Sequence, residues 1–322
     1  MRAVFATSFS ADDPLSGLEI GDRPEPEAGD GWKVVQVKAT SLNHHDLWTL
    51  RGVGITEDRL PMILGCDAAG VDPSTGEEVI VHSVITQPGW SGDETLDPKR
   101  SLLSERFQGT FAQYVAVPAF NVLPKPAELS FVEAACLPTA WLTAYRMLFT
   151  NSGLRPGQTV LVQGSSGGVA SACITLARAA GLRVWATART EEKQQLAKDF
   201  GAHQAFASGA RLPDRVDGVM ETVGAATWAH SVKSLKPGGR IVISGATSGF
   251  APPAELNRIF FLSLSVVGST MGTKQELQDL MSFLLATGIR PHIDHTAPLS
   301  DAADALRAMD AGNIAGKIVL EP

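Results

Sequence analysis

The segment Val160–Ala170 joins an apolar run to a turn of small residues, and it is the part of the chain most suited to binding an anion. It reads Val-Leu-Val-Gln-Gly-Ser-Ser-Gly-Gly-Val-Ala and leads into an Ala-rich stretch of helical character. A strand, a tight turn and a helix N-terminus in this order present unpaired N–H groups and the positive end of a helix dipole, which favour a pyrophosphate. We interpret the segment as a dinucleotide-binding loop, which implies redox chemistry; the alternative is a Ser/Gly-rich surface turn.

The composition sets bounds on the class of protein. The chain has 322 residues, 44% of them hydrophobic, which is enough for a sizeable core and about two domains. Its net charge of -7 gives no basic footprint for nucleic acid. Cys66, Cys136 and Cys173 are far apart and match neither a metal-binding pair nor a disulfide framework. With no secretory h-region and no apolar run of roughly 18 residues, we expect a cytoplasmic protein that does not bind nucleic acid or membranes.

The pattern of elements changes near Val132. Before it the chain is β-rich, with strands expected at 33–39 and 78–81, and the polar segment Thr86–Gln108 is expected to be a long exposed loop. After it, helical stretches alternate with strand-like runs at 160–163, 183–187, 216–220, 240–244 and 265–268, as in a doubly wound parallel sheet. Helices at 274–286 and 301–311 and a strand at 317–320 are expected to follow.

The order of motifs resembles the medium-chain dehydrogenases/reductases over essentially the whole length, and within them the zinc-free, quinone oxidoreductase-like branch. The matching segments are Leu42–Leu47, Pro61–Gly70, Leu137–Tyr145, the glycine loop, Gly238–Arg240 and Gly316–Leu320. The resemblance implies an α/β protein with a GroES-like β-barrel catalytic domain, residues 1–121 and 271–322, and a Rossmann domain, residues 122–270. It also implies that cofactor and substrate meet between the two domains.

The glycine loop departs from the plain dinucleotide fingerprint at its outer positions. Ser165 and Ala170 replace the first and third glycines, whereas Gly167 and Gly168 keep the centre, where the backbone must approach the pyrophosphate. Small side chains suffice at the two outer places.

The end of the next strand favours NADPH over NADH. Ala188 stands where an NAD-specific relative carries an acidic residue, and Arg189 follows it. A 2′-phosphate would meet no carboxylate there and would pair with Arg189 and Lys193. The alternative, a solvated helix start, is kept open by the neighbouring Glu191 and Glu192.

Further cofactor contacts are implied by the resemblance, mostly at strand ends, where doubly wound sheets bind ligands. They are Thr139, Thr143, Ser165, Ser166, Gly167, Gly168, Val169, Thr187, Thr222, Gly224, Gly245, Ala246, Gly268, Ser269, Thr270, Asn313 and Lys317. The alternative for the small residues among them is a role in tight turns.

Zinc chemistry is disfavoured by the residues at the family's ligand positions. The catalytic zinc of the related alcohol dehydrogenases would meet Asn43, Cys66 and Leu137 here. Tetrahedral zinc needs three or four good ligands, so no metal is expected, in spite of His44 and His45. If the backbone is extended there, these two side chains point to opposite sides. For His82, His203, His230, His292 and His295 we expect surface or loop positions.

Without a metal, hydride transfer to a simple ketone lacks its main electrophile. Quinones and α,β-unsaturated carbonyl compounds are already activated and need only donors facing the developing oxyanion. Asn43 is the leading candidate, to donate to that oxygen or to position the nicotinamide ribose; alternatively it is a helix cap. The proton donor is His44, His45 or solvent. Trp48 stands where several relatives carry a tyrosine, and is either an apolar wall for the acceptor or ordinary core.

Three functions are compatible with these residues. The leading prediction is a zinc-independent, NADPH-dependent reductase of a quinone or activated alkene. The alternatives are an alcohol dehydrogenase-like enzyme with an altered zinc site, formed by Cys66 and a neighbouring histidine, and a non-catalytic NADPH-binding protein. The resemblance places the apolar stretch Leu262–Thr270 at a sheet edge that joins two subunits, so a homodimer is expected.

Overall fold

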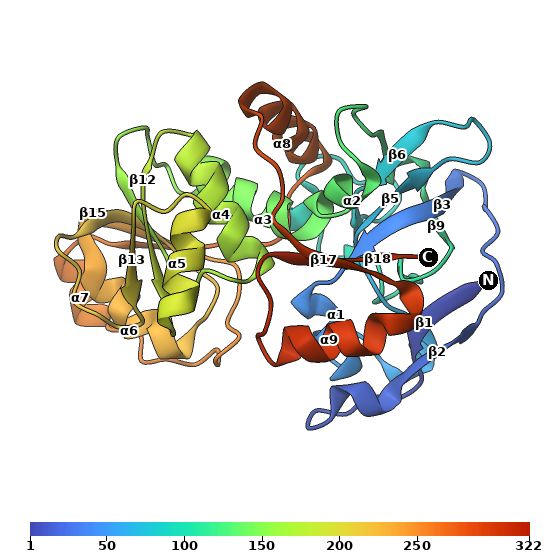
Figure 1. Ribbon diagram of the computed structural model, residues 1–322, viewed down its shortest axis with the longest axis horizontal. Coiled ribbons are helices and arrows are strands. Elements are labelled where there is room, and N and C mark those ends of the chain that lie inside the picture. The colour runs from blue at the N-terminus through green and yellow to red at the C-terminus, as the bar shows by residue number, and fades with distance from the viewer. The chain divides into compact units, whose positions relative to one another are not determined.

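Figure 1 shows the computed structural model, which describes residues 1–322 and divides into two compact units. The first unit contains Met1–Ala140, Met271–Leu285 and Ile293–Pro322. The second contains Trp141–Thr270 and Ala286–His292. Both ends of the chain therefore belong to the first unit, and the second is formed mainly from the middle of the chain.

The first unit is built on mostly antiparallel strands centred on the long strand β3, and β17 and β18 are a parallel pair. A seven-stranded sheet has the order β10-β6-β5-β3-β18-β17, and β9 also pairs with β3. Because β3 pairs with the C-terminal strand β18, residues from the two ends of the chain meet there. The strands of this unit are β1 (Arg2–Ala6), β2 (Leu18–Asp22), β3 (Trp32–Ser41), β4 (Met62–Ile63), β5 (Ala68–Val71), β6 (Glu78–Val81), β7 (Val84–Ile85), β8 (Ser101–Leu102), β9 (Tyr114–Pro118), β10 (Val122–Pro124), β17 (Ile293–Pro298) and β18 (Lys317–Glu321).

Helices α1 and α9 of the first unit pack together over an apolar core. Leu47 and Leu50 of α1 and Leu306 of α9 are completely buried in one cluster. The helices are α1 (His44–Leu50), α2 (Phe131–Ala134), α8 (Lys274–Thr287) and α9 (Ala302–Asp310), and a π-helical turn spans Leu137–Trp141. Helix α1 begins where the Asp46 carboxylate accepts the Asn43 backbone N–H at 2.8 Å, which satisfies one of the unpaired donors of its first turn.

The second unit is a six-stranded parallel sheet in the order β13-β12-β11-β14-β15-β16. Strand order reverses at β11, with β12 on one side and β14 on the other, and ligands of such sheets bind beyond the strand ends at that place. Helices α4 and α5 pack against β11, β12 and β13, and α6 packs against β14 and β15 (Figure 1). The strands are β11 (Thr159–Val162), β12 (Arg183–Ala188), β13 (Gln204–Ala207), β14 (Val216–Glu221), β15 (Leu235–Ile243) and β16 (Ser265–Gly268); the helices are α3 (Leu142–Tyr145), α4 (Gly168–Ala179), α5 (Glu191–Asp199), α6 (Ala225–Ser234) and α7 (Leu256–Phe261).

The architecture confirms the expected α/β fold, and one local expectation was wrong. Segment 86–108 is not an exposed loop: it contains β8, which pairs with β7, and several of its polar residues are buried. The Asp97 carboxylate accepts the backbone N–H groups of Gln87 and Lys99, at 2.7 and 2.8 Å, so the segment satisfies its own buried backbone.

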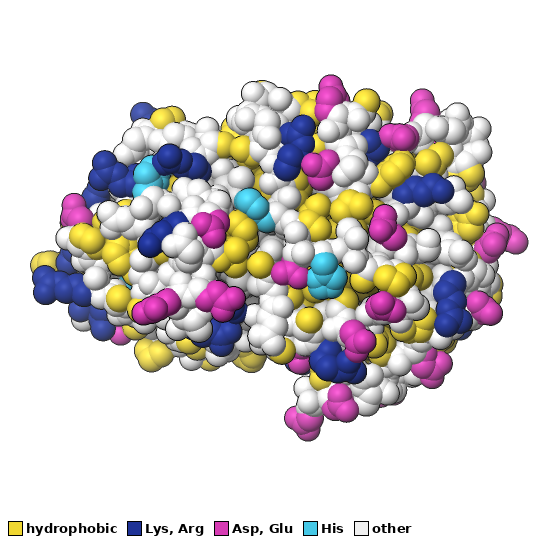
Figure 2. All heavy atoms as spheres, in the orientation of Figure 1, with side chains coloured by type: hydrophobic (Ala, Val, Ile, Leu, Met, Phe, Trp, Pro, Cys, Tyr) yellow, Lys and Arg dark blue, Asp and Glu magenta, His cyan; other side chains and the backbone are white.

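The charge distribution on the surface and the character of the helices are relevant to binding of nucleic acids and membranes. On the face drawn in Figure 2, acidic and basic side chains are interspersed, and the basic ones form no continuous stripe. No helix combines the length and the apolar character needed to cross a bilayer.

Candidate active site

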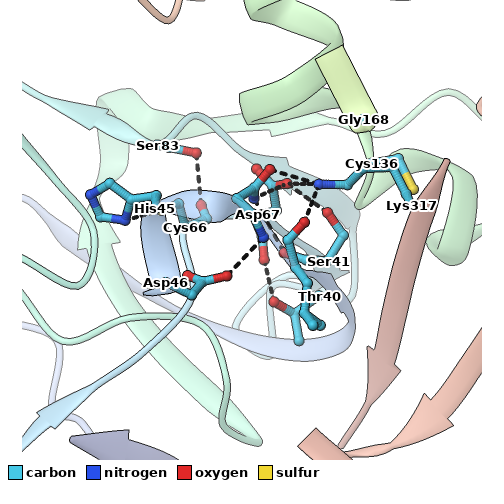
Figure 3. Close-up of polar contacts among 12 residues, drawn as sticks. Thr40, Ser41, His45, Asp46, Cys66, Asp67, Ser83, Cys136, Gly168 and Lys317 are labelled. Carbon is cyan, nitrogen blue, oxygen red and sulfur yellow. Dashed lines mark hydrogen bonds and ion pairs between the residues drawn. The ribbon is translucent and has the colours of Figure 1, made fainter. Parts of the chain in front are cut away.

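Asn43, Asp67 and Lys317 form a buried polar cluster in the first unit. Figure 3 labels Asp67 and Lys317. The Lys317 ammonium donates to the Asn43 Oδ1 atom at 2.6 Å and to the Leu42 carbonyl at 2.5 Å, and it lies 3.5 Å from the Asp67 Oδ2 atom. Asp67 Oδ2 also accepts from Asn43 Nδ2 at 2.8 Å and from the Ser41 hydroxyl at 2.6 Å. Every polar atom of the Asn43 amide is thus committed within the unit.

Next to this cluster, Cys66, His45 and Glu105 form a chain of contacts. The Cys66 Sγ atom lies 3.1 Å from His45 Nδ1, and His45 Nε2 lies 3.1 Å from Glu105 Oε1. The Leu102 backbone N–H and the Ser101 hydroxyl donate to Glu105 Oε2 at 2.8 and 3.2 Å, which fixes the carboxylate. The carboxylate in turn fixes the orientation of the imidazole, so that Nδ1 faces the sulfur.

Burial dominates the acid–base properties of these groups. It raises the pKa of the Cys66 thiol, against the opposing effect of His45. It also raises the pKa of the Asp46 carboxyl to about 6, although His45 and the Asn43 N–H work in the other direction. At Glu105 burial alone would raise the pKa, but the hydrogen bonds with His45 and Leu102 outweigh it and the pKa is lowered.

The three positions that the family resemblance assigns to catalytic zinc do not fit that ion. The Asn43 Oδ1 atom already accepts from a cation, the Lys317 ammonium, and Leu137 offers a buried isobutyl group. Only Cys66 provides a zinc ligand, whereas tetrahedral zinc requires at least three. The structure thus places an ammonium group against Asn43, where the resemblance would place a metal ligand.

The remaining candidates for catalysis differ in accessibility. His44 and His45 both lie in α1; His44 is exposed at the first turn and His45 faces Cys66. Trp48 is half-buried on the same helix, with the Arg51 guanidinium 5.3 Å from its ring centroid. Asn43 occupies the cap position of α1, but its side chain makes no cap hydrogen bond.

The glycine loop of the second unit lies between the end of β11 and the start of α4. Gly164 has a φ of +84°, which favours glycine, and no side chain caps the first turn of α4 at Gly167. The Ser165 hydroxyl donates to the Lys193 carbonyl at 3.0 Å, which ties the loop to α5. Ser166, Gly168 and Val169 are half-buried along the same turn. The loop therefore offers free N–H groups and the helix dipole to an anion.

Thr187 is hydrogen-bonded to this loop and to the residue after β11. Its side chain is completely buried; its hydroxyl donates to Gln163 Oε1 at 2.6 Å and accepts from the Gly164 N–H at 3.3 Å. These contacts give Thr187 a role in positioning the loop, and the predicted contact with the cofactor stays a prediction.

Arg189 and Lys193 lie together at the end of β12. Ala188 is the last residue of the strand and is buried, and Arg189 after it is exposed. Burial lowers the pKa of the Lys193 ammonium, and the positive charge of Arg189 lowers it further. Two cations thus repel each other at the place where the sequence predicted a 2′-phosphate.

The turns after β14 and β15 approach each other closely. Gly224 has a φ of +91°, and a Cβ there would lie 2.4 Å from the Gly249 carbonyl oxygen. A Cβ on Gly245 would lie 3.0 Å from the Thr222 oxygen, and one on Gly224 would lie 2.8 Å from Ala246 Cα. Tight packing of two turns therefore explains these small residues, and it brings four predicted cofactor residues together.

The other predicted contacts are dispersed. Gly268 ends β16, the Ser269 hydroxyl accepts from Asn151 Nδ2 at 3.0 Å, and Thr270 is exposed. Thr139 lies in the π-helical turn with a buried hydroxyl that has no hydrogen-bond partner, Thr143 is buried in α3, and Asn313 is exposed after α9. The Lys317 ammonium is buried against Asn43, and its predicted contact with the cofactor stays a prediction.

Sequence reasoning missed two acidic residues of the site. Asp67 belongs to a matched segment, Gly65-Cys66-Asp67, and its position beside Cys66 was the available signal. Glu105 lies in a segment expected to be exposed, and no local pattern marks it as the partner of His45.

Comparison with known proteins defines the class. Residues 29–127 match the model of the "Alcohol dehydrogenase GroES-like domain", and residues 168–286 match the model named "Zinc-binding dehydrogenase". An alcohol dehydrogenase of Geobacillus stearothermophilus is 30% identical over 100% of this chain and 99% of its own length. This chain belongs to the medium-chain dehydrogenase/reductase superfamily, and it is an oxidoreductase by that kinship.

Individual relatives differ in what their names state. A quinone oxidoreductase of Lama guanicoe is 28% identical over 99% of this chain and 97% of its own length. An acryloyl-coenzyme A reductase of Sulfurisphaera tokodaii is 27% identical over 96% of this chain and 98% of its own length. Among solved structures, an NAD-dependent alcohol dehydrogenase superposes with a TM-score of 0.91 at 34% identity, with both chains fully covered.

Proposed function

We propose that this protein is a zinc-independent, NADPH-dependent reductase of a quinone or an activated alkene. The observation that carries the proposal is the contact between Asn43 and Lys317, because an ammonium group occupies the Oδ1 atom at a position that binds zinc in related alcohol dehydrogenases. The quinone oxidoreductase and the acryloyl-coenzyme A reductase among the relatives support this substrate class.

The second unit supplies the features needed for the cofactor. The glycine loop and the uncapped first turn of α4 suit the pyrophosphate. The mutual repulsion of Arg189 and Lys193 would be relieved by a 2′-phosphate, which favours NADPH. When bound, the reduced nicotinamide supplies the hydride.

The residues of the first unit would orient the acceptor and stabilise the charge that develops on its oxygen. Asn43 Nδ2 donates to Asp67 Oδ2 and to the Ser41 carbonyl, so an acceptor oxygen would compete with these partners for its hydrogens. Lys317 holds the Asn43 oxygen and thereby turns the NH2 group of the amide in one direction. His44 is the exposed imidazole of α1 and is the candidate proton donor, with a pKa that desolvation and the Lys317 charge lower.

The test is a substrate panel combined with removal of metal. NADPH oxidation is measured with a quinone, an enone and an enoyl thioester, before and after exhaustive chelation, and alcohols are tested as substrates for NADP⁺ reduction. We expect turnover of the activated acceptors to survive chelation. Activity that is lost on chelation and restored by Zn²⁺, or activity with alcohols alone, would overturn the proposal.

A second candidate function is favoured by one observation. Cys66 Sγ and His45 Nδ1 are 3.1 Å apart, as an alcohol dehydrogenase-like enzyme with an altered zinc site would require. For that function the zinc-loaded protein must oxidise alcohols, which the same panel measures.

Assembly is a further part of the proposal. Strand β16 is the edge of the parallel sheet, and Val266 on it is 44% exposed. In the neighbouring α7, Phe260 and Phe261 are 73% and 81% exposed. An uncovered apolar edge suits a two-fold dimer. Sedimentation at micromolar concentration is expected to show a dimer, with Val266→Lys shifting it to monomer; a monomeric wild-type protein would refute this.

A further inference from the structure

Three side chains with different ligand atoms converge beside the Asn43 cluster. His45, Asp46 and Cys66 each offer one nitrogen, oxygen or sulfur atom, and these atoms lie within 4.8 Å of one another. Figure 3 shows that His45 and Asp46 come from α1 and Cys66 from the segment before β5. Thiolate, imidazole and carboxylate are the three ligand types that zinc takes in proteins.

The Asp46 carboxylate has one oxygen atom without a hydrogen-bond partner. The Asp46 side chain is completely buried; its Oδ2 atom accepts from the Asn43 N–H, but its Oδ1 atom has no hydrogen bond. A buried acceptor without a partner is costly, and most such atoms in folded proteins are satisfied. A cation bound at this place would satisfy Oδ1 without disturbing the Oδ2 contact.

The imidazole is held as metal-ligating histidines are held. Such histidines donate their second ring N–H to a carboxylate or carbonyl, which fixes the tautomer and makes the ligating nitrogen more basic. His45 Nε2 lies 3.1 Å from Glu105 Oε1, and the Nδ1 atom on the other side of the ring faces Cys66. The Ser104 hydroxyl lies 3.4 Å from the same Nδ1 atom and is close enough to complete the surroundings.

We propose that Cys66 Sγ, His45 Nδ1 and Asp46 Oδ1 form a binding site for a divalent transition-metal ion, with Zn²⁺ the best match. The site lacks Asn43 and Leu137, so its ligand set differs from the one that the family resemblance assigns to catalytic zinc. On binding, the Cys66 thiol loses its proton to solvent and the sulfur bonds to the metal. Mg²⁺ and Ca²⁺ are disfavoured, because both prefer sites made only of oxygen.

Burial of these residues disfavours a catalytic ion. Cys66, Asp46 and Ser104 are completely buried, whereas catalytic zinc keeps a position open to substrate. The side chains of His45 and Glu105 are 16% and 21% exposed, so an ion would enter past them. The inference thus goes beyond the proposed function, whose hydride transfer does not use this ion.

The test uses Co²⁺ as a spectroscopic probe on the full chain freed of metal by a chelator. We expect one Co²⁺ per chain, with intense d–d bands of four-coordinate cobalt and a thiolate-to-cobalt charge-transfer band, and displacement of the cobalt by Zn²⁺. Cys66→Ser is expected to abolish the charge-transfer band. Cys136→Ser is the matched control, because Cys136 is also a buried thiol of the first unit, with the Val132 carbonyl as its partner at 3.3 Å.

Two further variants keep the test decisive if Cys66→Ser fails to fold. Asp46→Asn retains the hydrogen bond that its oxygen accepts from the Asn43 N–H but loses the charge. Glu105→Gln removes the carboxylate charge beside His45 and leaves one acceptor oxygen to serve either His45 or the donors of Ser101 and Leu102. Each is expected to weaken Co²⁺ binding by about 10- to 100-fold, with circular dichroism confirming the fold. A charge-transfer band absent from the wild-type protein, or unchanged in the folded Cys66→Ser variant, would overturn the proposal.

The outcomes separate this site from the proposed function. Cobalt binding together with quinone or enone turnover by the metal-free protein supports both. Cobalt binding with turnover that depends on zinc keeps the metal site and overturns the zinc-independent reaction. Turnover without cobalt binding overturns the metal site alone.

Discussion

Replacing Lys317 by methionine is expected to destabilise the protein strongly. The Lys317 side chain is 3% exposed, and its ammonium contacts the Leu42 carbonyl, Asn43 Oδ1 and Asp67 Oδ2. Methionine keeps most of the apolar stem but removes the charge. The Asp67 carboxylate, which is completely buried, then keeps its neutral donors, Ser41 and Asn43, but loses its only cation.

The size of the effect follows from burial. Removing one partner of a buried ion pair costs about 3–5 kcal/mol, because the other charge remains desolvated. The pair between Lys236 and Asp217 is the matched comparison: its N–O distance is 3.0 Å, but the lysine is 42% exposed. Such exposed pairs contribute under about 1 kcal/mol. Lys317→Met is therefore expected to cost several times more than Lys236→Met.

Urea denaturation followed by far-UV circular dichroism measures both variants. The double variant Lys317→Met/Asp67→Asn, which removes both charges, is expected to recover roughly half of the loss, since the oxygen of the introduced amide would still accept from the Ser41 hydroxyl. If Lys317→Met loses no more stability than Lys236→Met, or if the double variant is as unstable as the sum of the single ones, the ion pair does not hold this cluster together.

Three other expectations concern pH, cofactor and catalysis. Burial lowers the pKa of His82 in the folded protein to about 3, whereas its pKa in the unfolded chain is about 6.5. The contribution of neutral His82 to the free energy of unfolding is therefore complete above about pH 6.5 and is lost as the pH falls toward 3, by about 2 kcal/mol between pH 7 and 5. His82→Gln should flatten the measured dependence of the free energy of unfolding on pH. Arg189→Ala should weaken NADPH binding by about 1.5–3 kcal/mol with NADH hardly affected, and an equal loss for both in fluorescence titrations would contradict the 2′-phosphate assignment. Asn43→Ala should lower kcat/KM by roughly 10²-fold, whereas a loss of stability alone, with kcat/KM retained, would reduce Asn43 to a structural residue.

The pH expectation rests on a histidine whose surroundings the sequence did not reveal. His82 lies in the loop between β6 and β7, as expected for a surface or loop residue, but it is completely buried, with Nε2 3.0 Å from the Gly272 carbonyl. The partner lies 190 positions away in the chain. Local polarity indicates a loop correctly, but it cannot show that a distant segment covers that loop.

Within the parallel sheet, the same limit separates the five strands that were predicted from the one that was missed. Strands β11 and β12 are apolar runs buried on both faces, and a run of this kind is readable from sequence alone. Strand β13, Gln204–Ala207, lies at the sheet edge and is only partly buried, so nothing forces an apolar pattern on it. Its existence follows from pairing with β12 and not from its own residues.

The candidate site shows how pairing of distant strands determines chemistry. Strand β18 pairs with β3 so that Val319 faces Ser41, and this register places Lys317 beside Asn43, 274 positions away in sequence. No local spacing predicts that contact, although both segments were recognised separately.

This register also determines which polar atoms of the site contact Lys317 and which do not. The ammonium of Lys317 takes the oxygen acceptors of Leu42, Asn43 and Asp67, which are the ligands that suit a strongly hydrated point charge. The thiol of Cys66 and the Nδ1 atom of His45 are left over, and neither is a good acceptor for an ammonium group. The Lys317 ammonium therefore occupies the oxygen acceptors that a metal ion could otherwise use. The Cys66 sulfur and the His45 nitrogen beside them are left available to a metal. The two proposals are therefore compatible, because hydride transfer at Asn43 would need no metal and the proposed zinc site uses other atoms a few residues away.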